Sequence, residues 1–156
     1  MKITTICFLI KDDKVCLGMK KRGFGAGKWN GFGGKVGDKE VNKDETIEES
    51  VIREAGEEFN IIPKQLNKVA QIFFKFPSQP EWGQHCHIFL IPKWKGEPTE
   101  SEEMQPGWFS FDKLPFDRMW PYDKLWIPRI LAGEKLVANF EFDKDNKITK
   151  QEIKTA

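Results

Sequence analysis

Residues 45–61 read Glu-Thr-Ile-Glu-Glu-Ser-Val-Ile-Arg-Glu-Ala-Gly-Glu-Glu-Phe-Asn-Ile, and this stretch predicts an amphipathic helix over residues 46–59. Thr46 can cap the first turn, and Glu49 follows three residues later as in a capping box. Apolar residues recur at intervals of four and would face a core: Ile47, Val51, Ala55 and Phe59.

The polar face of this helix is acidic. Glu54, Glu57 and Glu58 share one face because helical positions i, i+3 and i+4 are neighbours. Three such carboxylates repel one another unless a cation lies between them, and Mg²⁺ prefers oxygen ligands that it shares with substrate phosphates. Arg53, four residues before Glu57, can hold that carboxylate in place. A solvated acidic surface is the alternative for a run of glutamates considered alone.

A glycine-rich segment precedes the helix and favours the metal-site interpretation. Residues 23–37 hold seven of the 13 glycines. Glycine allows a positive φ and a close approach of the backbone to a ligand. The patterns on either side predict strands over 3–10, 15–19, 69–76, 85–91 and 108–111, a helix over 123–131, and a final hairpin over 135–142 and 147–153.

Length and charge narrow the class of protein. The chain has 156 residues, which we expect to form one domain over 1–156, and 25 basic residues balance 24 acidic ones to give a net charge of +1. A domain that holds duplex nucleic acid usually carries a basic excess. The three cysteines show no CxxC spacing, so we expect a reducing compartment and a cytoplasmic location. No segment has the length of a membrane span. Strands flanking two helical segments predict an α/β domain with a mixed sheet.

The acidic helix resembles the signature of the Nudix family, which reads Gly-x5-Glu-x7-Arg-Glu-U-x-Glu-Glu-x-Gly-U, where U is bulky and apolar. Glu45 stands eight residues before Arg53, as that signature requires, and Ile61 matches its last position. Two departures lie in or near the helix. Ala55 replaces a bulky residue, and Asn60 replaces the final Gly, although Asn also suits a left-handed helix cap. A third departure lies upstream, where ten residues instead of five separate Gly34 from Glu45, so that residues 39–44 look like an insertion.

The resemblance extends through residues 17–36, 97–104, 108–109, 114–116 and 119–121. Within the family these segments are most similar to the animal MutT homologues, which hydrolyse oxidised purine nucleoside triphosphates. The resemblance implies a Nudix α/β/α sandwich with a mixed sheet. It also implies hydrolysis of 8-oxo-dGTP, 2-hydroxy-dATP or O6-methyl-dGTP to the monophosphate and pyrophosphate.

The resemblance also implies roles for individual residues. Mg²⁺, with Mn²⁺ as a possible substitute, would be held by the Gly33 carbonyl, Glu54, Glu57, Glu58 and Glu103. Arg53 would belong to the catalytic group, and either Glu58 or Glu103 would be the general base. The substrate-binding positions would be Thr5, Lys20, Phe24, Asn30, Phe32, Gly33, Gly34, Lys35, Met104, Trp120, Pro121, Tyr122 and Asp123.

Several of these positions would form a pocket for the purine base. Asn30 can offer both a donor and an acceptor to the base edge. Trp120 can stack on the base, with Phe24 and Phe32 as walls of the pocket; plain core packing is the alternative for Trp120 and Phe32. The family has two adjacent aspartates after Trp-Pro, whereas this chain has Tyr122-Asp123. This change leaves the preferred modified purine open.

Alternatives therefore remain at the level of function. The protein could act on unmodified triphosphates, dinucleotides or capped RNA, or it could bind nucleotides without catalysis. We expect a small-molecule nucleotide partner, no polymeric nucleic acid, no membrane and a monomeric state. His85 and His87 have a metal-like spacing but no third ligand, so we expect a packed or hydrogen-bonded pair. Residues 143–146 resemble the start of a calcium loop, but Lys147 breaks the ligand pattern and a hairpin turn is expected.

Overall fold

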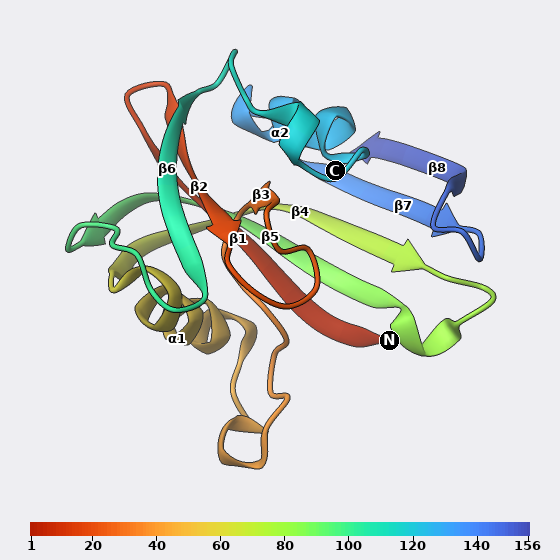
Figure 1. Ribbon diagram of the computed structural model, residues 1–156, viewed down its shortest axis with the longest axis horizontal. Helices are drawn as coiled ribbons and strands as arrows, with labels where there is room; N and C mark the ends of the chain where they lie inside the picture. Colours follow the sequence, from red (N-terminus) through yellow and green to blue (C-terminus); the bar gives the residue numbers. More distant parts are fainter.

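One mixed sheet runs through the molecule, with strands in the order β3-β2-β1-β5-β4-β7-β8 and with β6 on the other edge of β2 (Figure 1). The computed structural model describes residues 1–156. The strands are β1 (Lys2–Lys11), β2 (Lys14–Lys20), β3 (Trp29–Asn30), β4 (Ile62–Lys75), β5 (Gln84–Lys95), β6 (Met104–Ser110), β7 (Leu136–Phe142) and β8 (Ile148–Thr155). The pairs β1–β5 and β4–β7 are parallel and the others are antiparallel, which confirms the predicted mixed sheet.

Two helices, α1 (Ile47–Phe59) and α2 (Asp123–Leu131), cover opposite faces of this sheet. Cys7 and Phe8 are neighbours on β1, and because successive side chains of a strand point to opposite faces they enter different cores. Cys7 lies in the cluster that contains Val51 and Phe59 of α1, whereas Phe8 lies in the cluster that contains Trp126 of α2. The predicted α/β/α sandwich is therefore confirmed.

Local sequence signals set the ends of α1. Thr46 is the N-cap, and its side chain accepts from the Glu49 N–H at 3.1 Å while the Glu49 side chain accepts from the Thr46 N–H at 2.9 Å. Asn60 ends the helix in the left-handed conformation with φ 59°. The capping box and the Asn cap predicted from sequence are thus both present.

The strand bounds differ from the prediction mainly in β4, which begins at Ile62 and not at Val69. Its first half contains Pro63, which is buried, and the pairing with β5 shifts register three times between Pro63 and Ala70. These irregularities remove the simple alternation of polar and apolar residues from which a strand is predicted. β6 also starts earlier than expected, at Met104.

The remaining elements are short. Three 3-10 helices are present: η1 (Glu40–Asn42), η2 (Pro80–Trp82) and η3 (Phe116–Arg118). The predicted helix over 123–131 is confirmed as α2, although it contains Pro128. No helix combines the length and the apolar character that a membrane crossing needs.

Candidate active site

The glycine-rich loop lies along β1 and is thereby brought against α1. The Thr5 N–H donates to the Gly34 carbonyl at 2.9 Å, and the Thr5 hydroxyl accepts from the Gly34 N–H at 3.4 Å. At Gly33, which has φ 146°, an added Cβ would lie 2.1 Å from the Thr5 carbonyl oxygen. At Gly34 it would lie 2.6 Å from Oε1 of Glu54. Glycine is therefore required at position 33, where the loop touches the backbone of β1, and at position 34 it lets the loop lie directly against the Glu54 carboxylate.

The oxygen atoms at this contact suit a hard cation. The Gly33 carbonyl accepts no backbone hydrogen bond, and Oε2 of Glu58 is buried without a partner. Burial and the neighbouring Glu54 raise the pKa of Glu58 to about 9, and burial also raises the pKa of Glu54. Two neighbouring carboxylates that are partly withdrawn from solvent are unfavourable until positive charge joins them. The residues present therefore fit a divalent metal ion.

Arg53 connects the carboxylates of this region. Its Nε and Nη2 donate to Glu45 at 2.9 Å and 2.8 Å, and its Nη1 donates to Glu57 at 3.2 Å and to Glu54 at 3.3 Å. The hydrogen bonds from Arg53 hold the pKa of Glu45 at about 2. The predicted contact between Arg53 and Glu57 is confirmed. The sequence analysis did not predict that Glu45 holds Arg53 in place. Only the spacing of eight residues between Glu45 and Arg53 could have indicated this contact.

Glu103 lies in a different ion pair. Arg22 donates from Nε and Nη2 to Oε1 of Glu103, and these hydrogen bonds lower the pKa of Glu103. Arg53 similarly holds Glu57. No three acidic, histidine or cysteine side chains surround one point at coordinating distance. A metal ion held by all of the predicted groups would therefore require Glu57 and Glu103 to turn away from their arginines.

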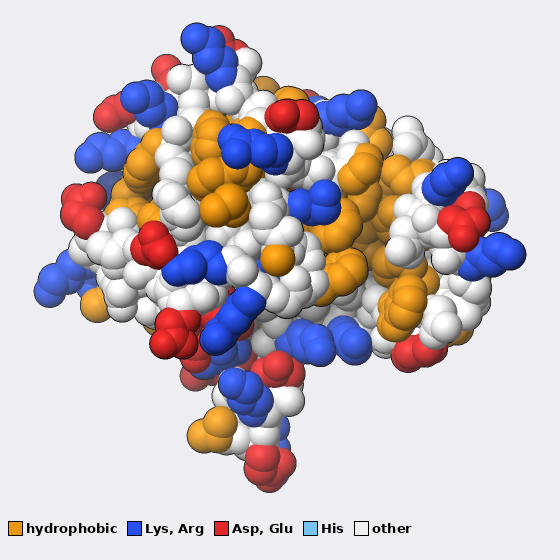
Figure 2. Space-filling view, viewed as in Figure 1, with side chains coloured by type: hydrophobic (Ala, Val, Ile, Leu, Met, Phe, Trp, Pro, Cys, Tyr) orange, Lys and Arg blue, Asp and Glu red, His pale blue; other side chains and the backbone are white.

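The predicted base pocket centres on Trp120, which is half-buried. Phe24 stacks on its ring with 5.2 Å between centroids and 25° between planes, and Nζ of Lys28 lies 5.1 Å from its centroid. Figure 2 shows hydrophobic side chains gathered in a hollow over β4 and β7, with Lys and Arg side chains beside it. Stacking surfaces beside positive charge suit a base joined to phosphates.

Asp123, the first residue of α2, is the buried carboxylate of this region. It is 1% exposed, and its Oδ2 accepts from the Trp120 N–H at 3.1 Å. Burial raises its pKa to about 7. Asn30 is only partly buried, and its Oδ1 accepts from the Gly31 N–H at 2.8 Å, which leaves its amide N–H groups free. Asp123 and Asn30 can therefore offer different donors and acceptors to a base edge.

Tyr122 packs among aromatic rings that the sequence prediction did not include. Its ring centroid lies 5.4 Å from Phe74, 5.6 Å from Phe140 and 5.4 Å from Phe142. Its plane is within 7° of that of Trp120, at 6.3 Å. Burial raises the pKa of the Tyr122 hydroxyl. The Tyr122 ring thus extends an aromatic wall. The only feature of the sequence that could have indicated Phe74, Phe140 and Phe142 is the expected alternation of core-facing and outward-facing residues along β4 and β7.

Other predicted positions divide between the loop and the core. The prediction that Phe32 forms a wall of the base pocket is wrong. Its ring is fully buried against Phe59, with 5.4 Å between the ring centroids. Met104 is buried and pairs with Lys20 across β2 and β6, on the metal side. Lys35 and Pro121 are exposed.

The two histidines and the turn at residues 143–146 have structural roles, as expected. Nε2 of His85 lies 2.8 Å from Oε1 of Gln71, and the His85 ring stacks on Phe73 and packs beside His87. Oδ1 of Asp143 accepts from the N–H groups of the β7–β8 turn, as predicted for a hairpin.

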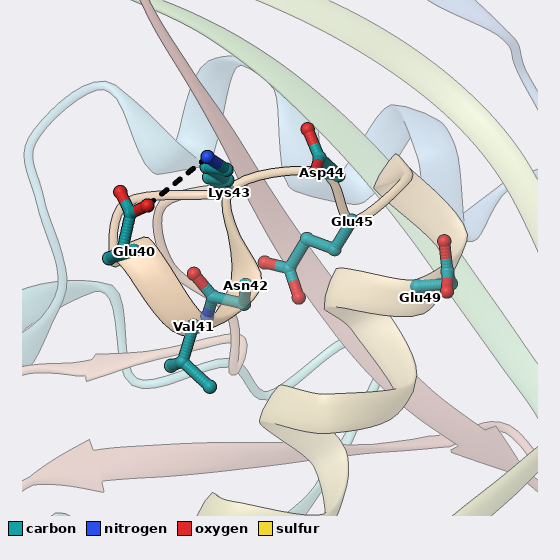
Figure 3. A pocket seen from close by; sticks show the side chains of 7 residues that line it. All are labelled: Glu40, Val41, Asn42, Lys43, Asp44, Glu45 and Glu49. Atoms are coloured by element: carbon teal, nitrogen blue, oxygen red, sulfur yellow. Dashed lines mark hydrogen bonds and ion pairs between the residues drawn. The ribbon is translucent and has the colours of Figure 1, made fainter.

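The inserted residues project away from the sheet as a loop that contains η1 (Figure 1). The Gly37 N–H donates to Oε1 of Glu45 at 2.9 Å, which closes the base of the loop. Side chains of this loop line a surface hollow of about 440 Å³, and Nζ of Lys43 lies 3.1 Å from Oε1 of Glu40. Figure 3 shows these side chains and the ion pair between Lys43 and Glu40. The extra residues therefore leave the spacing of the helix carboxylates unchanged.

Comparisons with known proteins agree with this arrangement. Residues 1–130 match the NUDIX domain family. The chain is 42% identical to the oxidized purine nucleoside triphosphate hydrolase of Danio rerio over 97% of this chain and 94% of that protein. It is 44% identical to the protein of the same name from Mus musculus over 94% of this chain and 90% of that protein.

A solved structure supports the fold. The crystal structure of a MutT protein from Bacillus halodurans superposes with a TM-score of 0.82 at 23% identity, and covers 98% of this chain and 97% of that one. Enzymes with a NUDIX domain generally need a divalent metal ion, which agrees with the partly buried carboxylates of Glu54 and Glu58 on α1. From the match over 1–130 and the identity to these relatives, the chain belongs to the Nudix family.

Proposed function

We propose that this protein hydrolyses oxidised purine nucleoside triphosphates to the monophosphate and pyrophosphate with Mg²⁺. The observation that carries the proposal is the pair of neighbouring, partly buried carboxylates of Glu54 and Glu58, which lies against the Gly33–Gly34 turn. The high identity to the zebrafish and mouse hydrolases supports the class of substrate.

Each group on the metal side has a distinct role in this proposal. Glu54, Glu57, Glu58, Glu103 and the Gly33 carbonyl hold the ion. When bound, Mg²⁺ supplies positive charge to the phosphates and to the leaving pyrophosphate, and Mn²⁺ can substitute for it. Arg53 orients Glu57, and Glu45 fixes Arg53. Lys20, whose charge acts on Glu58, adds positive charge beside the phosphates.

Glu58 and Glu103 remain the two candidates for the general base. Glu58 lies next to Glu54 with its Oε2 buried, whereas Glu103 is a surface carboxylate engaged by Arg22. A base must reach the attacking water, so the choice rests on geometry in the presence of substrate. Glu58→Gln and Glu103→Gln separate the two candidates when kcat at saturating Mg²⁺ is compared with Mg²⁺ binding measured on the same variants. The variant that still binds Mg²⁺ but loses about 10²–10⁴-fold in kcat has lost the base.

On the base side, Trp120 and Phe24 provide stacking surfaces, and Asp123 with Asn30 reads the purine edge. Tyr122 lies in the aromatic wall, so Asp123 is the single carboxylate of the Tyr122-Asp123 pair that can read the edge. A nucleotide other than an oxidised purine triphosphate is the second candidate substrate, and the absence of a second aspartate favours it. We also propose that residues 1–156 act as one domain, since β7 and β8 extend the same sheet as β1. We further propose that the protein acts as a monomer.

The test is pyrophosphate release with Mg²⁺ from dGTP, 8-oxo-dGTP, 2-hydroxy-dATP and O6-methyl-dGTP under identical conditions. We expect one of the modified purines to exceed dGTP by at least about tenfold in kcat/KM, because a correctly placed hydrogen-bonding group discriminates by that much or more. Faster turnover of unmodified or capped substrates would move the function to the second candidate. Glu57→Gln serves as the inactive, folded control, and retained turnover in that variant would remove the metal-site assignment.

A further inference from the structure

A second groove lies where the β1–β2 turn meets the end of β5. It has a volume of about 610 Å³ and is lined by Lys11, Asp12, Lys14, Pro92, Lys93, Trp94, Gly96, Glu97 and Trp108. Lys14 and Lys20 begin and end β2. Because a strand rises about 3.3 Å per residue, the groove lies roughly 20 Å along β2 from the metal side. None of its residues belongs to the active site described above.

Two tryptophans form one wall of this groove. The rings of Trp94 and Trp108 stack with 6.0 Å between centroids and 26° between planes. Trp94 packs against the core under α1, so its position is explained by closing that core. Trp108 is 41% exposed, and core packing does not account for its outer face. That face is a flat apolar platform at the surface, held in position by Trp94 behind it.

Positive charge surrounds the platform. Lys11, Lys14 and Lys93 are exposed, and none of them takes part in an ion pair of the protein. Asp12 and Glu97 also line the groove, yet neither is within ion-pair distance of these lysines. The three ammonium groups are therefore available to an anion from outside.

We propose that this groove is a second nucleotide-binding site, in which a base stacks on Trp108 and the phosphate contacts Lys11, Lys14 and Lys93. Aromatic stacking combined with lysine contacts is the chemistry by which proteins hold nucleotides without reading their sequence. A free mononucleotide and a nucleotide at the end of a single strand share this chemistry. The proposal does not depend on the hydrolytic function.

The experiment is a titration followed by NMR at the tryptophan indole N–H groups of the full chain. The six tryptophans are assigned with single Trp→Phe variants. The probes are AMP, adenosine, ribose 5-phosphate and a short oligothymidylate. We expect AMP to shift the Trp94 and Trp108 signals saturably at millimolar concentration, and adenosine and ribose 5-phosphate to bind at least about fivefold more weakly. The Trp120 signal reports the active site separately, so occupation of that site cannot be mistaken for occupation of the groove.

Matched variants decide whether the lysines contribute. Lys11→Ala with Lys93→Ala should weaken AMP binding at Trp108 about tenfold, whereas Lys144→Ala with Lys150→Ala, at the far edge of the sheet, should leave it unchanged. Stationary Trp94 and Trp108 signals up to about 10 mM AMP and oligothymidylate would overturn the proposal. Equal binding by both double variants would overturn it too. If oligothymidylate binds at least about tenfold more tightly than AMP, the result supports the proposal and identifies the ligand as the end of a single strand. If AMP binds more tightly, the result supports the proposal and identifies the ligand as a free nucleotide.

Discussion

Glu45 and Arg53 are eight residues apart in the chain and are joined by two hydrogen bonds of 2.9 Å and 2.8 Å. Glu45 precedes α1, whereas Arg53 lies in its middle. The Glu45 side chain is 8% exposed and also accepts from the Gly37 N–H. The pair therefore joins the glycine-rich loop to the helix that carries Glu54 and Glu57.

Glu45→Gln should lower both stability and turnover. The substitution removes the charged partner of Arg53, which costs about 2 kcal/mol in the free energy of unfolding. Arg53 then loses the charged acceptor of its two shortest hydrogen bonds and is held less firmly beside Glu54 and Glu57, so kcat should fall while KM changes less. Urea denaturation and steady-state kinetics measure the two effects. Glu48→Gln is the matched control, because Glu48 is exposed in the same helix and forms no ion pair.

The stability difference between Glu45→Gln and the natural protein should depend on pH. In the folded state the pKa of Glu45 is lowered from 4.5 to about 2 by Arg53. A lowered pKa gives stability that is present above the ordinary value and is lost as the pH falls through the folded value. We therefore expect the difference to be full above pH 4.5 and to shrink towards pH 2. A constant difference across this range would show that Glu45 stabilises the fold through something other than its charge.

Glu58→Gln should abolish turnover but stabilise the metal-free protein. Oε2 of Glu58 is buried without a partner, and burial and the neighbouring Glu54 raise the pKa of Glu58 to about 9. Near neutral pH the metal-free protein must therefore protonate Glu58 when it folds, which costs stability, and a neutral Gln side chain avoids that cost. Mg²⁺ should raise the melting temperature of the natural protein, because a ligand that binds the folded state stabilises it. It should raise that of Glu58→Gln much less. Thermal melts with EDTA and with Mg²⁺ measure this, and an equal response of both proteins would contradict the assignment of Glu58 as a ligand.

Asp123→Asn should remove a pH dependence of substrate binding near neutrality. Burial raises the pKa of Asp123 from 3.8 to about 7, so the carboxyl is a donor below pH 7 and only an acceptor above it. A base edge that offers an acceptor should bind best below pH 7, and one that offers donors should bind best above it. KM measured against pH for two modified purines checks this. A KM profile unchanged in Asp123→Asn would show that another group titrates.

The same raised pKa affects stability in a defined direction. A raised carboxyl pKa gives stability that is full below the ordinary value of 3.8 and is lost as the pH rises to about 7. The natural protein should therefore lose stability relative to Asp123→Asn over this interval. Chemical denaturation of both proteins at a series of pH values measures the difference.

Tyr122 should act through its ring and not through its hydroxyl. Tyr122→Phe keeps the contacts with Phe74 and Phe140, so stability and substrate preference should stay within about twofold of the natural values. Tyr122→Asp removes the ring and places a second carboxylate next to buried Asp123. It should lower the free energy of unfolding by about 3 kcal/mol and change the ranking of the purine substrates. A substrate preference altered by Tyr122→Phe would instead give the hydroxyl a direct role.

Local sequence information determined α1 and the order of its carboxylates. The capping box at Thr46, the apolar repeat through Phe59 and the Asn60 cap are properties of neighbouring residues, so they could be predicted without knowledge of the fold. The same holds for the convergence of Glu54, Glu57 and Glu58, since helical periodicity alone places them on one face.

Tertiary structure decided which groups these residues meet. Nothing local to Phe32 distinguishes a pocket wall from a core residue, and the pairing of its loop with β1 placed the ring in the core against Phe59. Arg22 and Glu103, 81 residues apart, meet because loops that follow β2 and precede β6 lie together. Burial of Asp123 and Tyr122 likewise depends on strands far away in the chain. Long-range contacts set desolvation and charge partners, and these physical quantities cannot be read from the spacing of residues along the sequence.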